Sequence, residues 1–178
     1  CAGLIASATA LAQTPDRVVF ATDWLAQAEH GGYYQALAEG IYKKYGLEVT
    51  LKMGGPQVNG LQLLAAKQLD IVMADALQVV SAVEQNVPVV AIAATFQKNP
   101  TAIIAHPGVS SLEELKGKPI AIGAASNTTF WPWLRQRYGF SDNQKRPYGF
   151  SVQPFLADPA LSQQGFATSE PFSIEKGG

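Results

Sequence analysis

The chain has 178 residues, of which 47% are hydrophobic and only 15% are charged, and its formal net charge is −1. This length and hydrophobic share fit a folded protein of about one or two domains, whereas the balanced charge argues against a nucleic-acid-binding protein, which needs a basic surface. The single cysteine excludes an internal disulfide framework and a cysteine-based zinc site, and no apolar run reaches the ~18 residues of a membrane span.

The first twelve residues, CAGLIASATALA, are small or apolar and end in an A-x-A pattern. Such a pattern after an apolar run is typical of the cleavage site of a secretory signal peptide. We therefore expect residues 1–12 to be a signal-peptide remnant cut before Gln13, which predicts an exported, periplasmic protein without a membrane-inserted segment. Two alternatives are an apolar helix of the folded domain and a lipid anchor on Cys1.

Strand-like and helix-like patterns alternate between residues 17 and 95. We expect strands at residues 17–22, 47–53, 69–74 and 88–95, and helices at residues 34–45, 61–67 and 76–85. The alternation predicts an α/β fold with a mostly parallel sheet covered by helices. Because the run at 88–95, PVVAIAAT, is almost wholly apolar, it predicts a fully buried strand.

A second unit is predicted after the polar segment QKNP at residues 97–100, whose composition suits a crossing between domains. We expect strands at residues 101–105, 119–123 and 165–168, a short helix opened by the S-x-x-E pattern at Ser111, and helices at 130–138 and 159–164. The sequence therefore predicts two lobes, residues 13–97 and residues 98–178.

The loops that follow the predicted strands carry no motif for nucleophilic catalysis or phosphate binding, since G-x-S-x-G, G-x-x-x-x-G-K-[ST] and G-x-G-x-x-G are all absent from the sequence. They do carry the carboxylates Asp23, Glu29, Asp75 and Glu170, each of which suits a helix cap or a structural acceptor better than a general base. Ligands of open α/β sheets bind beyond the carboxyl ends of the strands, so these loops are the expected site.

Aromatic and amide side chains occur in the same loops. Trp24 follows the first strand and Trp131 opens the helix at 130–138, and each aromatic either packs beneath its own loop or stacks on a planar ligand. Asn59, Asn127 and Thr128 would add directional hydrogen bonds. Glycines such as Gly31 would let the backbone approach a ligand closely.

Several blocks of the sequence resemble the NMT1/THI5-like family. The opening block is DW at residues 23–24, HGGYY at 30–34 and AEGIYKKYGLEV at 38–49, and later blocks are NGLQLL at 59–64, LDIV at 69–72 and LEELKGKPIA at 112–121. No single block is decisive, but their order and spacing are specific. The resemblance covers nearly everything from Arg17 to about Glu170.

This resemblance implies a type II periplasmic-binding fold, in which two lobes of mostly parallel sheet and flanking helices close on a ligand through a hinge. It implies a solute-binding protein that passes its ligand to the permease subunits of an ABC importer. It also implies that the chain is a fragment, because the family returns to lobe one after lobe two. Members similar to the pyrimidine carriers stack the ring on an aromatic and use a lobe-two carboxylate, which we match to Trp24 and Glu170.

We therefore expect a non-enzymatic carrier of a thiamine-pyrimidine-precursor-like or related heterocycle, with no cofactor, no metal and no nucleic-acid partner. The candidate ligand-binding residues are Asp23, Trp24, His30, Gly31, Asn59, Asp75, Asn127, Thr128, Trp131 and Glu170.

Three alternatives remain within the same resemblance. One is an anion carrier for nitrate, sulfonates or taurine, and another is the effector lobe of a transcription regulator. The third is a pyrimidine synthase that holds pyridoxal phosphate on a lysine and consumes a histidine four residues later. The matching positions here are Ala74 and Gln78, and a Schiff base needs an amine, so Ala74 argues against this chemistry.

Overall fold

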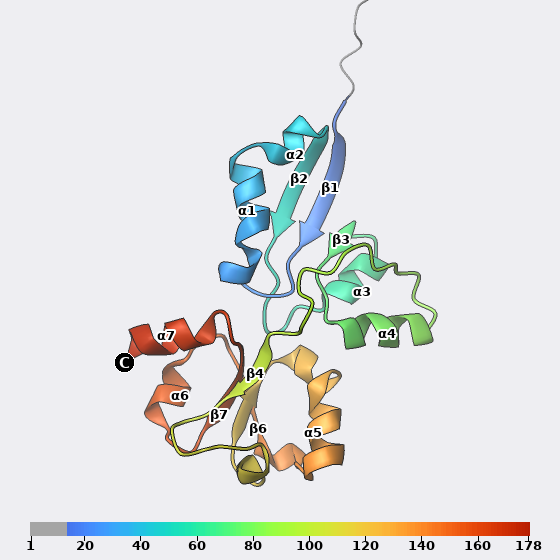
Figure 1. Cartoon of the computed structure of the whole chain (residues 1–178). Coiled ribbons are helices and arrows are strands. Elements are labelled where there is room, and N and C mark those ends of the chain that lie inside the picture. Colours follow the sequence, from blue (N-terminus) through green and yellow to red (C-terminus); the bar gives the residue numbers. More distant parts are fainter. Residues whose placement is uncertain (1–13) are drawn as a thin grey trace, which may run out of the picture.

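The computed structural model describes residues 14–178, so the predicted signal-peptide remnant, residues 1–12, lies outside the described residues. The described chain forms one sheet between residues 16 and 72 and a second sheet between residues 101 and 166, with helices beside both (Figure 1). Every strand pair except β4–β7 is parallel. The predicted α/β class with mostly parallel sheets is therefore confirmed.

The first sheet has the order β2-β1-β3, with β1 (Asp16–Ala21) between β2 (Leu47–Lys52) and β3 (Ile71–Val72). Its helices are the 3-10 helix η1 (Ala28–His30), α1 (Gly31–Ala38), α2 (Ile41–Lys44), α3 (Gly60–Ala65) and α4 (Ala76–Glu84). Burial along β1 increases toward its carboxyl end, where Phe20 and Ala21 are buried. The better-buried end of β1 is therefore its carboxyl end, where the loop that carries Asp23 and Trp24 begins.

The helix predicted at residues 34–45 is divided in two. Gly40 has a φ of 67°, in the left-handed region, and stands between α1 and α2. A residue in this conformation cannot continue an α-helix, and glycine adopts it without steric cost. The first helix also begins earlier than predicted, at Gly31.

The prediction of a buried strand at residues 88–95 is wrong. These residues form no strand, and Val90 and Ile92 are 82% and 74% exposed. An apolar run becomes a buried strand only beside a strand long enough to pair with it. Here β3 has two residues and is the edge of the first sheet in the described part of the chain.

The second sheet has the order β4-β7-β5-β6. Its strands are β4 (Thr101–Ile104), β5 (Ile120–Ile122), β6 (Lys145–Pro147) and β7 (Ser162–Phe166). Its helices are α5 (Phe130–Tyr138), α6 (Gln153–Ala157) and α7 (Glu170–Gly177), with 3-10 turns η2 (Glu113–Leu115), η3 (Ala124–Asn127) and η4 (Asp142–Gln144).

The helix predicted at residues 159–164 is also wrong. β7 already begins at Ser162, whose N–H donates to the Pro119 carbonyl at 3.0 Å, and it pairs with β4 on one side and β5 on the other. Pairing on both sides outweighs the weak strand preference of the sequence SQQGF.

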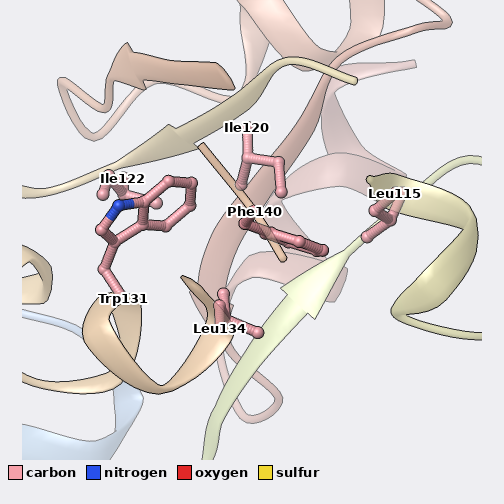
Figure 2. Close-up of a cluster of buried hydrophobic side chains, with 6 residues drawn as sticks. All are labelled: Leu115, Ile120, Ile122, Trp131, Leu134 and Phe140. Carbon is pink, nitrogen blue, oxygen red and sulfur yellow. The ribbon is translucent and has the colours of Figure 1, made fainter. Parts of the chain in front are cut away.

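A compact group of apolar side chains stabilises the second unit. Leu115, Ile120, Ile122, Trp131, Leu134 and Phe140 pack together beneath α5, as Figure 2 shows. All of them are at most 5% exposed. None of the helices in the described part of the chain has both the length and the apolar character that a membrane crossing requires.

Candidate functional site

A cavity lies between the two sheet units, with an empty volume of about 840 Å³ that includes space open to solvent. Its walls come from the segments that follow β1, β2, β3, β5 and β6, from the first residue of β4 and the last residues of β7, and from the starts of α3, α4, α5 and α7. Side chains of particular interest in the lining are Asp23, Trp24, Gln27, Ala74, Gln78, Tyr148, Gln164 and Glu170. The cavity therefore occupies the place where open α/β sheets bind ligands, beyond the carboxyl ends of the strands.

The turn after β1 is held rigidly, and this fixes Asp23 and Trp24. The Thr22 hydroxyl donates to the Trp24 carbonyl at 2.7 Å. A Cβ at Gly54 would lie 2.4 Å from the Thr22 carbonyl oxygen, so only glycine lets the chain after β2 approach the turn this closely. Both cavity side chains therefore start from a well-defined backbone.

Trp24 joins the two units by aromatic contacts. Its ring lies parallel to that of Tyr148, with 5.8 Å between the centroids and 9° between the planes, and Phe150 is tilted against it at 6.3 Å. Gly123 lies close to the same indole, because a Cβ there would be 3.4 Å from Trp24 Cη2. One side chain of the first unit is thus seated on aromatics of the second.

Asp23 is paired with a histidine that is itself out of the cavity. His30 is completely buried, and its Nε2 lies 3.0 Å from Asp23 Oδ1. Its Nδ1 accepts a hydrogen bond from the Gln27 backbone N–H at 3.3 Å. The Asp23 side chain is 30% exposed and lines the cavity, so the pair has one buried end and one end that a ligand can reach.

Glu170 is a buried carboxylate at the first residue of α7. It accepts hydrogen bonds from the Phe166 N–H at 2.6 Å, the Tyr148 hydroxyl at 3.1 Å and the Gln27 amide at 3.3 Å. Burial, and then the Glu170 charge, raise the pKa of Tyr148 above its ordinary range. The phenol therefore stays protonated and donates to the carboxylate. A Cβ at Gly165 would lie 2.8 Å from Glu170 Cγ, which explains the glycine there.

The charge of the cavity is negative. Asp23 and Glu170 are its only ionisable groups besides Tyr148, and no lysine, arginine or histidine occurs among the described residues that line it. One backbone N–H at the start of each of two nearby helices is already occupied, because Asn59 accepts from Gln62 N–H in α3 and Asp75 accepts from Leu77 N–H in α4. The lining therefore offers hydrogen-bond acceptors and aromatic faces more readily than positive charge.

Three of the predicted site residues, Asp23, Trp24 and Glu170, are brought together at this cavity. Asn59 and Asp75 lie outside it and serve as N-caps of α3 and α4. Asn127 and Thr128 also lie outside, where they donate to backbone carbonyls of the η3 turn.

The remaining predicted residues, His30, Gly31 and Trp131, do not line this cavity. Trp131 is 2% exposed and belongs to the core shown in Figure 2, and its Nε1–H donates to Asp142 at 2.9 Å. It lies on the inner face of α5 because a large apolar ring at that position fills the core. His30 is buried behind Asp23, and Gly31 is the first residue of α1 and is not among the residues that line the cavity.

Sequence reasoning missed Gln27, Tyr148 and Gln164. Gln164 accepts from the Gly123 N–H at 2.6 Å and from the Ser126 hydroxyl at 2.5 Å, so it fastens β7 to the turn after β5. Tyr148 follows β6 directly, and the strand KRP is too short and polar to be recognised from its pattern. Recognising that strand would have placed Tyr148 at a carboxyl end.

Ala74 and Gln78 both line the cavity. These are the two positions that the resemblance matches to the cofactor-binding lysine and the consumed histidine of the fungal synthases. At the same place in this chain the cavity presents a methyl group and an amide.

Residues 27–144 match a family model described as NMT1/THI5 like. The match covers more than half of the chain, so the chain belongs to the NMT1/THI5-like family, and the predicted resemblance is confirmed. This family suggests a substrate-binding protein of ABC-type transporters. No curated protein matches the chain.

Proposed function

We propose that this member of the NMT1/THI5-like family is an exported solute-binding protein that delivers a small heterocyclic ligand to the permease of an ABC importer. The observation that carries the proposal is the cavity between the two sheet units, to which both contribute side chains. In this proposal residues 13–97 and 98–178 act as the two lobes. A ligand that contacts both favours the closed arrangement, which the permease then recognises.

The lining favours a flat ligand with N–H donors. Trp24 offers an aromatic surface, and Asp23 and Glu170 place carboxylate oxygens in the lining. An aminopyrimidine of the thiamine-precursor type has a planar ring for the indole and an exocyclic amine for a carboxylate. Stacking of aromatic rings contributes about 0.5–1.5 kcal/mol beyond burial, and a hydrogen bond to a charged group about 1.5–3 kcal/mol.

The same lining disfavours the anionic alternatives. Nitrate, sulfonates and taurine carry a negative group that would enter a cavity holding Asp23 and Glu170 and no cation among the described lining residues. Like charges at close range repel each other, so an anion would need both carboxylates to be neutralised.

We propose that the protein performs no catalysis. Pyridoxal phosphate chemistry of the synthase kind needs a lysine amine, and Ala74 occupies the position matched to it. Gln78, at the second matched position, has a side-chain amide, which neither titrates nor acts as a nucleophile near neutral pH.

Isothermal titration calorimetry with 4-amino-2-methylpyrimidine, and separately with nitrate and taurine, tests the proposed ligand class. We expect heat of binding with the pyrimidine and none with either anion. Asp23→Asn removes a cavity charge without changing side-chain size and is expected to weaken pyrimidine binding about tenfold or more. Saturable binding of an anion, with no response to the pyrimidine, would overturn the proposal.

A further inference from the structure

His30 is a fully buried histidine with both ring nitrogens engaged. Its Nδ1 faces the Gln27 backbone N–H at 3.3 Å, and its Nε2 faces Asp23 Oδ1 at 3.0 Å. It does not line the cavity, whereas Asp23 does. Any influence of this histidine on a ligand must therefore pass through Asp23.

The hydrogen-bond network assigns the tautomer of His30. A backbone N–H can only donate, so the Nδ1 that faces Gln27 must carry a lone pair. The proton of the neutral ring is then on Nε2, from where it donates to Asp23 Oδ1. If the proton were on Nδ1 instead, this N–H would face the Gln27 N–H, and the bare Nε2 would face the Asp23 carboxylate oxygen, so neither hydrogen bond could form.

This arrangement commits one oxygen of Asp23 and leaves the second available. Oδ1 accepts from His30, while Oδ2 has no hydrogen-bond partner among the described residues. The backbone of Asp23 is fixed by the close approach of Gly54, as described above. With the backbone and one oxygen both held, the direction of the second oxygen is set.

We propose that His30 is the positioning residue that orients Asp23, so that Oδ2 accepts an N–H from the ligand and the site selects ligands that carry one. The proposal rests on the proposed ligand-binding function of the cavity. It differs from a purely structural role in a measurable way. A histidine that only fills space affects every ligand equally, whereas one that aims an acceptor affects only ligands with the matching donor.

Two substitutions at His30 separate these roles. His30→Gln keeps an amide N–H near the position of Nε2 and can still donate to Asp23. His30→Asn is shorter, so its polar atoms reach only the region of Nδ1, and the donation to Asp23 is lost. The two probes are 4-amino-2-methylpyrimidine and 2,4-dimethylpyrimidine, in which a methyl group replaces the amine.

We expect His30→Asn to lower affinity for the amino probe about tenfold and to leave affinity for the dimethyl probe within about twofold. His30→Gln should retain most of the preference for the amino probe. In an Asp23→Asn background, His30→Asn should cause no further loss, because the two residues act as one unit. Equal losses for both probes, or additive losses in the double variant, would show a structural role only.

A measurement without ligand keeps this proposal separate from the proposed function. Long-range ¹H–¹⁵N NMR of the imidazole reports which nitrogen carries the proton. We expect it on Nε2 in the wild type, with a shift of the Nε2 resonance in Asp23→Asn and none in the control Asp70→Asn, whose exposed side chain accepts from the Val19 N–H instead. If neither probe binds the wild type, the proposed ligand class fails. The NMR result is independent of that outcome: a proton on Nδ1 overturns the positioning role, and a proton on Nε2 supports it.

Discussion

Replacement of Trp24 by alanine is the most direct test of the aromatic wall of the cavity. The indole stacks on Tyr148 with 9° between the ring planes, and it also lines the cavity where a planar ligand would lie. The substitution therefore removes one contact to the ligand and one contact that holds the two units together around it.

The expected magnitude follows from these two contacts. Each aromatic pair contributes about 0.5–1.5 kcal/mol beyond the burial of its surface, so the loss of both is about 1–3 kcal/mol. Since ~1.4 kcal/mol corresponds to a tenfold change in Kd, we expect affinity for 4-amino-2-methylpyrimidine to fall about tenfold, and no less than about fivefold. Trp24 is only partly buried and packs against the edge of the small buried cluster of Ala121, Tyr148 and Leu161 without being one of its buried members, so the chain should still fold.

Titration calorimetry measures the effect, with circular dichroism as the check on folding. Trp133→Ala is the matched control, because Trp133 is 51% exposed, packs on Tyr138 and does not line the cavity. It removes the same side chain without touching the site. A Trp24→Ala protein that is folded and binds within about twofold of the wild type would refute the reasoning, and a flexible aliphatic ligand would then fit the cavity better.

Three further predictions concern other parts of the chain. The pKa of Tyr148 is raised above its ordinary value of 10.0, first by burial and then by Glu170. As the pH rises, the unfolded chain therefore loses this proton before the folded chain does, so the free energy of unfolding should fall above pH ~10. Urea unfolding at several pH values should show a smaller fall in Tyr148→Phe than in the wild type. Glu29 accepts hydroxyl hydrogen bonds from the residues that lead into α7, so Glu29→Gln should favour a more open arrangement, seen as a larger radius of gyration by small-angle scattering, while the exposed Glu39→Gln should not. Export should leave a mature chain that begins at Gln13, and N-terminal sequencing of periplasmic protein that instead starts at a lipidated residue would contradict this.

Much of the fold follows from local sequence patterns. Alternating residues in β2 and the capping residues Asn59 and Asp75 were sufficient to place β2, α3 and α4. These features work because their signals are local: a period of two for a half-buried strand, and a side chain that accepts from a backbone N–H two or three residues later.

Other elements depend on contacts far apart in the sequence. The strand SQQGF is stabilised by pairing with β4 and β5 on its two sides, which no window of its own sequence reveals. The apolar run at residues 88–95 gave the opposite error, because apolar character predicts burial only when a partner covers it. Both errors have the same origin in tertiary context.

The site divides in the same way. The position after a strand was enough to select Asp23, Trp24 and Glu170, since the geometry of parallel sheets gathers such residues at one edge. It could not show that Trp131 faces the core, because the direction of a side chain on α5 depends on the packing against the sheet. Nor could it show that His30 reaches the site through Asp23.

The exposed apolar surface of the first unit gives the last prediction. Leu77, Val80 and Val83 are each more than half exposed along one side of α4, and Val90 and Ile92 are exposed in the segment that follows. Exposed apolar side chains promote association where they gather into a contiguous patch larger than a few hundred Å².

We therefore expect residues 13–178 to be poorly soluble as isolated, and the double substitution Val80→Lys and Val90→Lys to raise the concentration at which the protein stays monomeric. Both side chains are already more than half in water, so their replacement should change the free energy of unfolding by less than about 0.5 kcal/mol each. Sedimentation velocity over a concentration series measures the association, and thermal unfolding followed by circular dichroism measures the stability. A control with two lysines at the exposed polar positions Gln35 and Gln62 adds the same charge without replacing any of these apolar side chains. If the control improves solubility as much as the test variant, net charge and not the apolar surface limits solubility, and the reasoning from exposure is wrong.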